Sequence, residues 1–370
     1  MNKTARILIA AIISILIIGA LCYGFINSDI TGRMYYIGGL VLFFVFSIGA
    51  VVGSFLNVVI LRSFSGESIV MPPSKCPKCN NKLKWWHNIP IISYLLLGGK
   101  CGFCEEKISI QYPIVEFITG IIFVGIFIVY GILPETIFAV LIASILIVLA
   151  VTDIKERVVF DKHTYFLIVT GLIYNFLLTA ITLYNQAFNT ISGFRITTEW
   201  VIYNPMTSSI LGLILGVIVM ECLARIGYLI AGERAFGEGD TYIAAGLGAA
   251  FGWQNFIIII VLSVILQIIA ILPVYLKKQF TGKHYGVLFS LPMFIILAIS
   301  YYVLSLKGIF ISRYVLKNIM LVLIGLFGIL SAFFTVKGLR AKDELTYFPF
   351  GPALAISGIL VLITNIHFTL

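Results

Sequence analysis

Four cysteines stand in two matched pairs within the longest polar stretch of an otherwise apolar chain. The pairs are Cys76-Pro-Lys-Cys79 and Cys101-Gly-Phe-Cys104, and 21 residues separate them. Each CxxC pair can bind one edge of a tetrahedral ion, and two pairs supply the four thiolates of a structural zinc site. The spacing therefore predicts a Zn²⁺ site at Cys76, Cys79, Cys101 and Cys104, in preference to a disordered loop with incidental cysteines.

Two acidic residues stand at the edges of apolar segments. Asp153 directly follows the apolar run 134–152, and Asp240 closes Gly237-Glu-Gly-Asp240 before a short Gly/Ala-rich stretch. Acids beside membrane segments are costly and are often functional. Two carboxyl groups that meet can share one proton, so that one activates a water molecule while the other polarises a peptide carbonyl. This pattern is consistent with aspartic-protease chemistry.

Other roles for these residues stay open at this point. Asp240 could instead be the N-cap of the helix that it opens, or part of an ion site. Asp153 could be an ordinary acid at a helix end. If the pair is catalytic, Gly237 and Gly239 would let the backbone turn sharply and let a substrate come close.

The elements that must position these residues are membrane helices. Of 370 residues, 60% are hydrophobic and only 11% are charged, whereas a soluble domain carries about 25% charged residues. A spanning helix needs about 20 apolar residues. With a shorter crossing at 241–252, we predict an all-α polytopic membrane protein of about 11 spans, the others at 7–27, 36–61, 113–131, 134–152, 164–184, 207–231, 255–275, 286–306, 314–336 and 350–368.

The basic residues predict how the chain is oriented. With the N-terminus in the cytoplasm, 20 of the 25 lysines and arginines fall in cytoplasmic segments, as the positive-inside rule requires. Both aspartates then lie at the cytoplasmic ends of their helices, at the same depth. The net charge of +9 is explained by this topology and by anionic lipid, so we expect no nucleic-acid partner. Cys22 and Cys222 are interpreted as buried small hydrophobes.

We expect the chain to divide into six parts. The first hydrophobic run is expected to be a retained helix because it is longer than the apolar core of a signal peptide. The zinc segment is too small to build a large core, so a metal would stabilise it. The parts are an additional N-terminal helix (1–35), a first core helix (36–61), a cytoplasmic zinc-binding segment (62–112), a membrane core with both aspartates (113–275), an inserted helix pair (276–343) and a C-terminal core helix (344–370).

In this order, the motifs resemble those of the type IV prepilin peptidases, also called prepilin leader peptidase/N-methyltransferases. The resemblance covers about 36–275 and about 345–365. It rests on Gly53-Ser-Phe-Leu-Asn57, Asn88-Ile-Pro-Ile-Ile-Ser-Tyr94, Ile108-Ser-Ile-Gln-Tyr-Pro113-Ile-Val-Glu116, Thr152-Asp153, Gly237-Glu-Gly-Asp240 and Pro349-Phe-Gly-Pro352, together with the cysteine pairs.

The resemblance implies a bifunctional enzyme of the bacterial inner membrane. Such enzymes cut the basic leader from type IV prepilins or pseudopilins at the cytoplasmic face, after a glycine. They then methylate the new N-terminal amine, commonly of Phe, with S-adenosylmethionine. It implies that Asp153 and Asp240 are catalytic and that the zinc segment belongs to the methyltransferase. It does not identify a methyl-donor pocket, since no glycine-rich nucleotide loop stands out.

The chain departs from the family pattern in several places. Tyr242 stands where many relatives have Lys, and Phe160 where many have Pro. The spans 7–27, 286–306 and 314–336 are additional to the usual eight. The alternatives that we keep are a peptidase without methyltransferase activity and, from another class, a polytopic transporter whose acids line a pathway.

Overall fold

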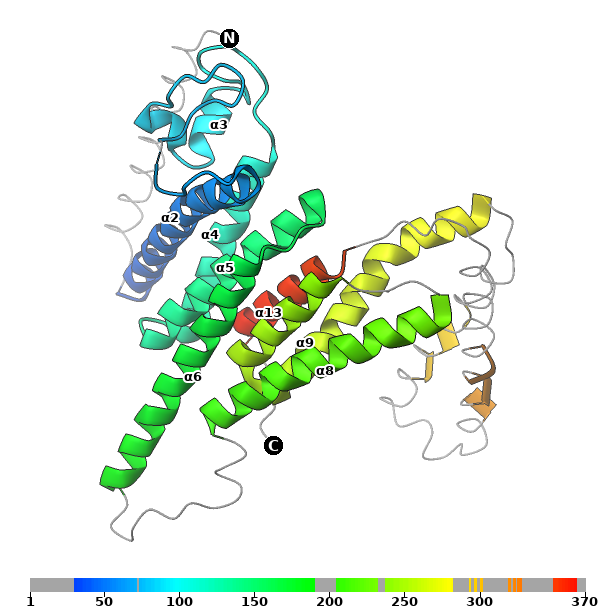
Figure 1. Cartoon of the computed structure of the whole chain (residues 1–370). Coiled ribbons are helices and arrows are strands. Elements are labelled where there is room, and N and C mark those ends of the chain that lie inside the picture. Colours follow the sequence, from blue (N-terminus) through cyan, green and yellow to red (C-terminus); the bar gives the residue numbers. More distant parts are fainter. Residues whose placement is uncertain are drawn as a thin grey trace.

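The fold is mostly helical, as predicted (Figure 1). The computed structural model describes residues 30–71, 73–189, 204–231, 237–281 and 349–364, with isolated positions between 293 and 327. Within these ranges there is no β-strand. The elements are α2 (Ile30–Ser65), the 3₁₀ helix η1 (Trp85–Asn88), α3 (Ile92–Leu96), α4 (Gln111–Tyr130), α5 (Pro134–Glu156), α6 (Asp161–Asn189), α8 (Pro205–Ala231), α9 (Glu238–Thr281) and α13 (Gly351–Thr364).

Six of the described helices are long and apolar enough to cross a membrane, so the chain is a multi-pass membrane protein. They lie within α2, α4, α5, α6, α8 and α9. The predicted spans 7–27, 286–306 and 314–336 lie outside the described residues, apart from isolated positions, and the total of 11 is not confirmed. Helix α13 has 14 residues, fewer than the roughly 20 that a full crossing requires.

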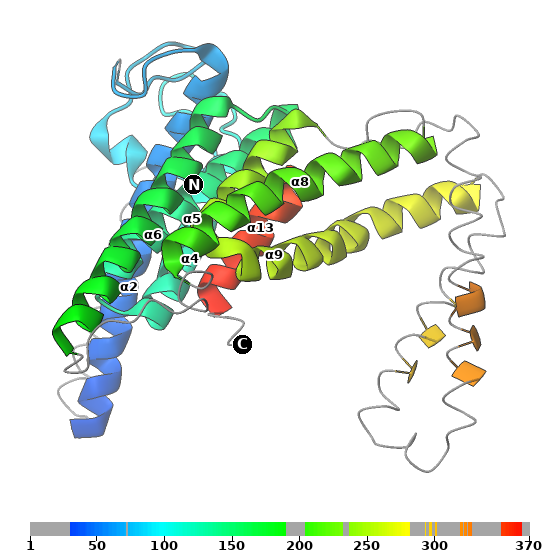
Figure 2. The same ribbon diagram turned by 60° about the horizontal axis from the view of Figure 1, so that its bottom comes forward.

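Helix α9 is broken at Gly252, whose φ of 76° and ψ of 168° are not helical. The break falls between the predicted segments 241–252 and 255–275, and the chain turns sharply there (Figures 1 and 2). A break leaves backbone carbonyls without helical partners, and these need others inside a membrane. Asn175 of α6 is the hydrogen-bond partner of two such carbonyl groups. Its Nδ2 donates to the carbonyl oxygens of Ala249 (3.0 Å) and Ala250 (3.2 Å).

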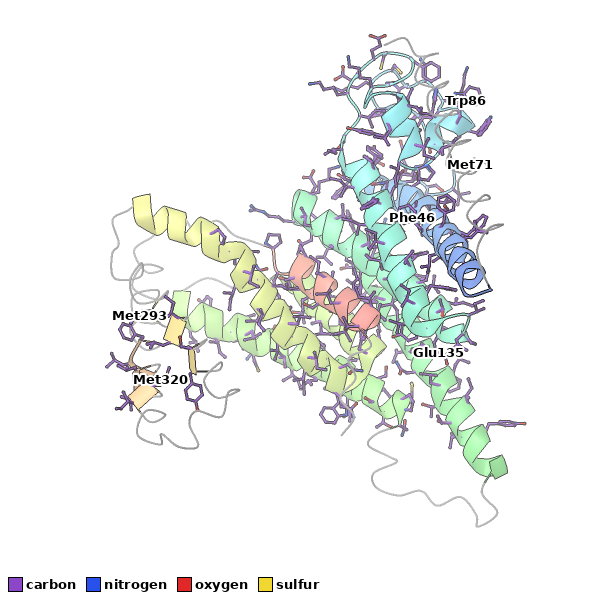
Figure 3. The ribbon with its side chains drawn as sticks, turned by 180° about the vertical axis from the view of Figure 1, so that it is seen from behind. Phe46, Met71, Trp86, Glu135, Met293 and Met320 are labelled. Atoms are coloured by element: carbon purple, nitrogen blue, oxygen red, sulfur yellow. The ribbon has the colours of Figure 1, made fainter. Side chains whose placement is uncertain are left out.

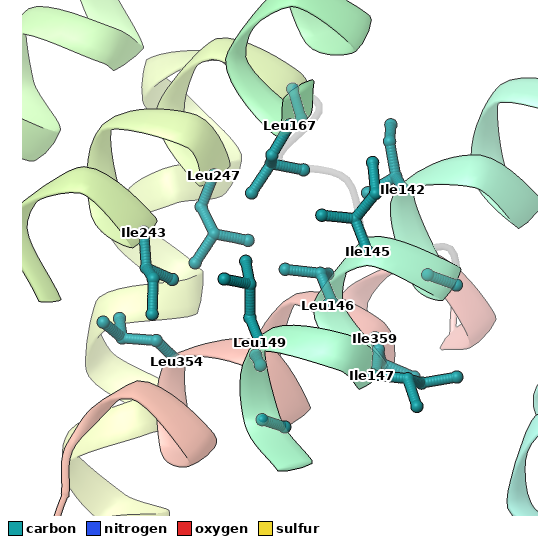
Figure 4. Close-up of a cluster of buried hydrophobic side chains, with 14 of the residues drawn as sticks. Ile142, Ile145, Leu146, Ile147, Leu149, Leu167, Ile243, Leu247, Leu354 and Ile359 are labelled. Atoms are coloured by element: carbon teal, nitrogen blue, oxygen red, sulfur yellow. The ribbon is translucent and has the colours of Figure 1, made fainter. Parts of the chain in front are cut away.

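The buried core includes residues of α2, α4 and α8, and the part shown in Figure 4 joins α5, α6, α9 and α13. Leu149 of α5, Ile243 of α9 and Leu354 of α13 are fully buried in it. Each lies about one turn from a residue singled out above: Asp153, Asp240 and the Pro349-Phe-Gly-Pro352 motif. The apolar core therefore fixes the helix ends that carry the two aspartates.

Small residues let neighbouring helices approach closely, as is common in membrane bundles. A Cβ at Gly49 of α2 would lie 2.9 Å from the Cα of Gly120 in α4. A Cβ at Gly216 of α8 would lie 2.6 Å from the carbonyl oxygen of Ala244 in α9. Bulkier side chains at these positions would push α2 from α4, and α8 from α9.

The two cysteines outside the CxxC pairs, Cys22 and Cys222, were both predicted to be buried. Cys222 of α8 is exposed on the described part of the protein, so the prediction that it is buried is wrong. An apolar position on a membrane helix can face lipid as readily as the helix bundle, and the sequence does not distinguish the two. Cys22 lies outside the described residues.

Candidate functional site

Asp153 lies inside the last turn of α5, three positions before the last residue of the helix. It follows the apolar run 134–152 and lies near the end of its helix, as expected; α5 continues to Glu156 and is capped by Arg157 in the left-handed conformation. The Arg157 N–H donates to the Asp153 carbonyl oxygen at 2.9 Å. Only 4% of Asp153 is exposed, so its carboxyl group is buried at this end of the bundle.

Asp240 is the third residue of α9 and not its N-cap. The helix begins at Glu238, and the Gly237 N–H donates to Oδ2 of Asp240 at 3.2 Å. This backward bond is the one that the acidic residue of a capping box makes. Asp240 is also 4% exposed, so one of its oxygens is fixed by local backbone while the carboxyl group stays within the core.

The two carboxyl groups converge, although they come from α5 and α9. They are close enough for the charge of Asp153 to act on Asp240. The backbone N–H of Gly351, the first residue of α13, contacts both carboxyl groups. A Cβ at residue 351 would overlap Oδ2 of Asp153. Asp153, Asp240 and Gly351 therefore form one buried cluster, to which three helices contribute.

Gly237 and Gly239 support this cluster in a different way from the sharp turn that we expected. Neither is among the described glycines with positive φ. A Cβ at Gly239 would lie 2.6 Å from the Cβ of Val159, just before α6. Glycine at 239 thus allows the start of α9 to approach the α5–α6 connection, and Gly237 provides the N–H that holds Asp240.

The sequence alone did not reveal the role of Gly351 in this cluster. Its motif, Pro349-Phe-Gly-Pro352, entered only as part of a resemblance. A glycine between bulky residues at the start of an apolar helix can mark a close backbone approach, and that is the signal that could have suggested this contact.

The four cysteines meet in the segment between α2 and α4. Their Sγ atoms all lie within 4.8 Å of one another, and those of Cys76 and Cys104 are 4.0 Å apart. Zinc–sulfur bonds of about 2.3 Å in a tetrahedron place sulfurs about 3.8 Å apart. The cluster therefore has the ligands and the spacing to hold a zinc ion, as predicted.

The two cysteine pairs form matching turns. In the first, the Asn80 N–H donates to the Cys76 carbonyl at 2.9 Å; in the second, the Glu105 N–H donates to that of Cys101 at 3.1 Å. Asn80 and Glu105 both have positive φ. The two halves of the candidate metal site are thus the same structural unit used twice.

The two thiols of the second pair, Cys101 and Cys104, have different pKa values. Burial opposes ionisation of Cys101, but the N–H groups of Cys104 and Phe103 outweigh it and lower the pKa to about 7. At Cys104 the Glu106 N–H lowers the pKa, while burial and the neighbouring thiols raise it, to about 12 overall. A thiol that ionises near neutral pH makes Cys101 a ready ligand for a cation.

A separate cavity of about 240 Å³ lies at the opposite end of the bundle. Polar residues in its lining include Tyr130, Glu135 and Asn175. Glu135 is the second residue of α5 and Asp153 lies near its other end, which puts them about 27 Å apart at 1.5 Å per residue. Figure 3 likewise shows Glu135 far from Trp86 and Met71 of the cysteine segment. The cavity is therefore not part of the aspartate cluster.

Two parts of the chain match described families. Residues 47–130 match the Bacterial Peptidase A24 N-terminal domain. Residues 140–272 match the Type IV leader peptidase family. The chain is also 32% identical to a prepilin leader peptidase/N-methyltransferase of Neisseria gonorrhoeae, over 65% of this chain and 83% of that protein. This chain belongs to the type IV leader peptidase family.

Other members of the type IV leader peptidase family are similar over comparable lengths. The chain is 33% identical to a prepilin leader peptidase/N-methyltransferase of Myxococcus xanthus, over 59% of this chain and 58% of that protein. It is 28% identical to one of Aeromonas salmonicida, over 75% of this chain and 94% of that protein. No solved structure matches the chain.

Proposed function

We propose that this chain is an intramembrane aspartyl endopeptidase that removes the leader of type IV prepilins or pseudopilins and then N-methylates the new N-terminal residue. The observation that carries the proposal is the convergence of Asp153 and Asp240, buried and in contact with one backbone N–H, within a chain of the type IV leader peptidase family. The names of its relatives support both activities.

In the proposed reaction the two carboxyl groups act as a pair. Two adjacent carboxylates repel each other, so the pair holds one proton between them. The ionised group takes a proton from water, and the water oxygen bonds to the scissile carbonyl carbon. The protonated group polarises the carbonyl oxygen. The C–N bond then breaks, the amine leaves with a proton, and the leader ends in a new carboxyl group.

Backbone donors would orient the pair for this task. The Gly237 N–H holds one oxygen of Asp240, and the Gly351 N–H contacts both carboxyl groups. Because these donors belong to helix ends fixed by the core, the carboxyl groups need little reorganisation when the substrate arrives.

The substrate would meet the pair at the edge of the membrane. We place the aspartates and the zinc segment on the cytoplasmic side of the bacterial inner membrane, following the distribution of basic residues. The apolar helix of the prepilin would then lie against the enzyme's helices, with its basic leader in the cytoplasm. Glu156 and Glu238 are exposed beside the two aspartates and are the candidates to attract the leader.

The methyl-transfer half is assigned to the zinc segment, with S-adenosylmethionine as the methyl donor. Cys76, Cys79, Cys101 and Cys104 would hold Zn²⁺. Four thiolates leave the ion no open position, so the zinc would join the two cysteine turns and take no part in the chemistry. The methyl group would pass to the amine that cleavage releases.

The test uses purified protein, a prepilin peptide and a labelled methyl donor. Asp153→Asn and Asp240→Asn should each reduce cleavage by about 10²- to 10⁴-fold, the usual contribution of a general acid or base. Methylation of a pre-cleaved peptide should survive. Asp161→Asn changes an exposed acid at the start of α6 and is the matched control.

The outcomes separate the candidate functions. Cleavage close to the parent rate in either variant would show that the aspartyl-protease assignment is wrong. Cleavage by the parent protein without label transfer would indicate a peptidase alone. Absence of both reactions in the parent would favour the transporter alternative.

A further inference from the structure

Three signature motifs have no place in the chemistry above, yet they meet at one point. They are Gly53-Ser-Phe-Leu-Asn57 on α2, Asn88-Ile-Pro-Ile-Ile-Ser-Tyr94 around α3, and the segment ending at Glu116 on α4. Glu116 is 7% exposed, and its Oε2 accepts a hydrogen bond from the Ile91 N–H at 2.7 Å. A buried carboxylate on a membrane helix thus binds the backbone of the cysteine segment.

The backbone at Ile91 is in an unusual conformation. Its φ of 60° and ψ of −51° immediately precede α3, and positive φ is strongly disfavoured for a β-branched residue. Such a conformation persists only where its surroundings hold it. The Glu116 side chain accepts a hydrogen bond from the N–H of this residue, so it stabilises the turn from which α3 starts.

The motif on α2 holds Glu116 in place. A Cβ at Gly53 would lie 2.8 Å from the Cα of Glu116, so α2 and α4 are in direct contact here. Ser54 also lies beside the same carboxylate. One turn further along α2, Nδ2 of Asn57 donates to the Tyr112 carbonyl at 3.1 Å. The carboxylate is therefore fixed from both helices, close to where the chain leaves the bundle.

We propose that Glu116 is a positioning residue for methyl transfer: through the Ile91 N–H it fixes the zinc segment on the end of the α2–α4 pair. The inference rests on the proposed methyltransferase function. Cleavage leaves the new N-terminus at the aspartates, and the zinc segment must be held in one orientation to receive it. Glu116 takes no proton in this role. Its side chain is long enough to place a hydrogen-bond acceptor at the Ile91 N–H.

The experiment compares three substitutions in the full-length purified protein. Glu116→Gln keeps a carbonyl oxygen at the same reach, Glu116→Ala removes the acceptor, and Glu116→Asp keeps the charge but shortens the side chain. Glu67→Ala, at an exposed acid of the zinc segment, is the control. Four quantities are measured: cleavage rate, kcat and KM for methylation of a pre-cleaved peptide, bound zinc, and hydrogen exchange over residues 88–97.

We expect the Ala and Asp variants to lose about tenfold to a hundredfold in kcat for methylation, because small misplacements of reacting groups cost that much. Their cleavage should stay within about twofold of the parent, zinc should stay bound, and residues 88–97 should exchange faster. The Gln variant should retain most of the methylation. This pattern separates positioning from loss of folding, which would reduce cleavage and zinc together.

Three results would overturn the proposal. In the first, the Ala variant methylates like the parent. In the second, the Asp variant is active and the Gln variant is not, which would mean that charge rather than reach matters. In the third, all three variants lose cleavage and zinc along with methylation. A parent protein without methyltransferase activity would instead refute the function on which the inference rests.

Discussion

Gly351 lies so close to Asp153 that a Cβ atom at residue 351 would overlap Oδ2 of the Asp153 carboxylate. The same glycine also contacts Asp240 through its N–H. Helix α13 therefore reaches the aspartate pair with its first residue, and the Pro349-Phe-Gly-Pro352 motif completes a cluster that α5 and α9 begin. This contact makes the C-terminal helix part of the candidate peptidase site.

The first prediction follows from that contact. Gly351→Ala should reduce prepilin cleavage by more than about tenfold, equivalent to about 1.4 kcal/mol, because the added methyl group would displace the Asp153 carboxylate. Cleavage of a prepilin peptide by purified protein measures it. Gly39→Ala is the control, since nothing lies within 4 Å of a Cβ at that glycine. Parent-like cleavage by the Gly351 variant would contradict the assigned contact.

The second prediction concerns the break in α9. Asn175→Ala should destabilise the protein by about 1–3 kcal/mol, the cost of leaving buried carbonyls without a partner. Its effect should be visible as a lower unfolding midpoint in detergent. Ser47→Ala serves for comparison, because that hydroxyl donates to a carbonyl of its own exposed helix and its loss should change the midpoint little. Equal midpoints for both variants would mean that Asn175 does not stabilise the break.

Features that depend on local sequence could be predicted well. The two CxxC pairs are short units whose spacing alone implies four ligands around one ion, and the four sulfurs do converge. The apolar runs predicted most of the described helices because lipid requires unbroken apolar segments. The distribution of basic residues predicted that Asp153 and Asp240 lie on one face of the membrane, and this made their convergence a reasonable expectation.

Features that depend on how helices pack could not be predicted. The sequence did not show whether Asp240 is the N-cap of α9 or lies inside the helix, because this depends on a shift of one or two residues in where the helix begins. The contact of Gly351 with Asp153 arises from the depth at which α13 enters the bundle. The backbone of Ile91 takes its conformation from a carboxylate on another helix, and nothing in its own sequence signals this.

The third prediction tests the orientation of the chain. A cysteine in place of the exposed Ser68, within the zinc segment, should react with an impermeant thiol reagent only from the cytoplasmic side. A cysteine in place of Ile132, which is 90% exposed between α4 and α5, should react only from the outside. The parent protein gives the background from its own thiols. Labelling of Ser68→Cys in intact cells would reverse the orientation and the proposed mechanism.

The fourth prediction concerns the metal. Purified protein should hold about one zinc per chain, as four converging thiolates imply, and the apparent affinity should fall as the pH falls because protons compete for those thiolates. Cys104→Ser should lower bound zinc and reduce methylation more than cleavage, since methyl transfer is assigned to the cysteine segment and cleavage to the two aspartates. Cys222→Ser, at an exposed cysteine on α8, should change neither. Metal analysis measures the bound zinc, and paired assays compare methylation with cleavage. Two results would show that the cysteine cluster does not serve as a zinc site for methyl transfer: protein purified without chelators contains no zinc, or the Cys104 variant methylates normally.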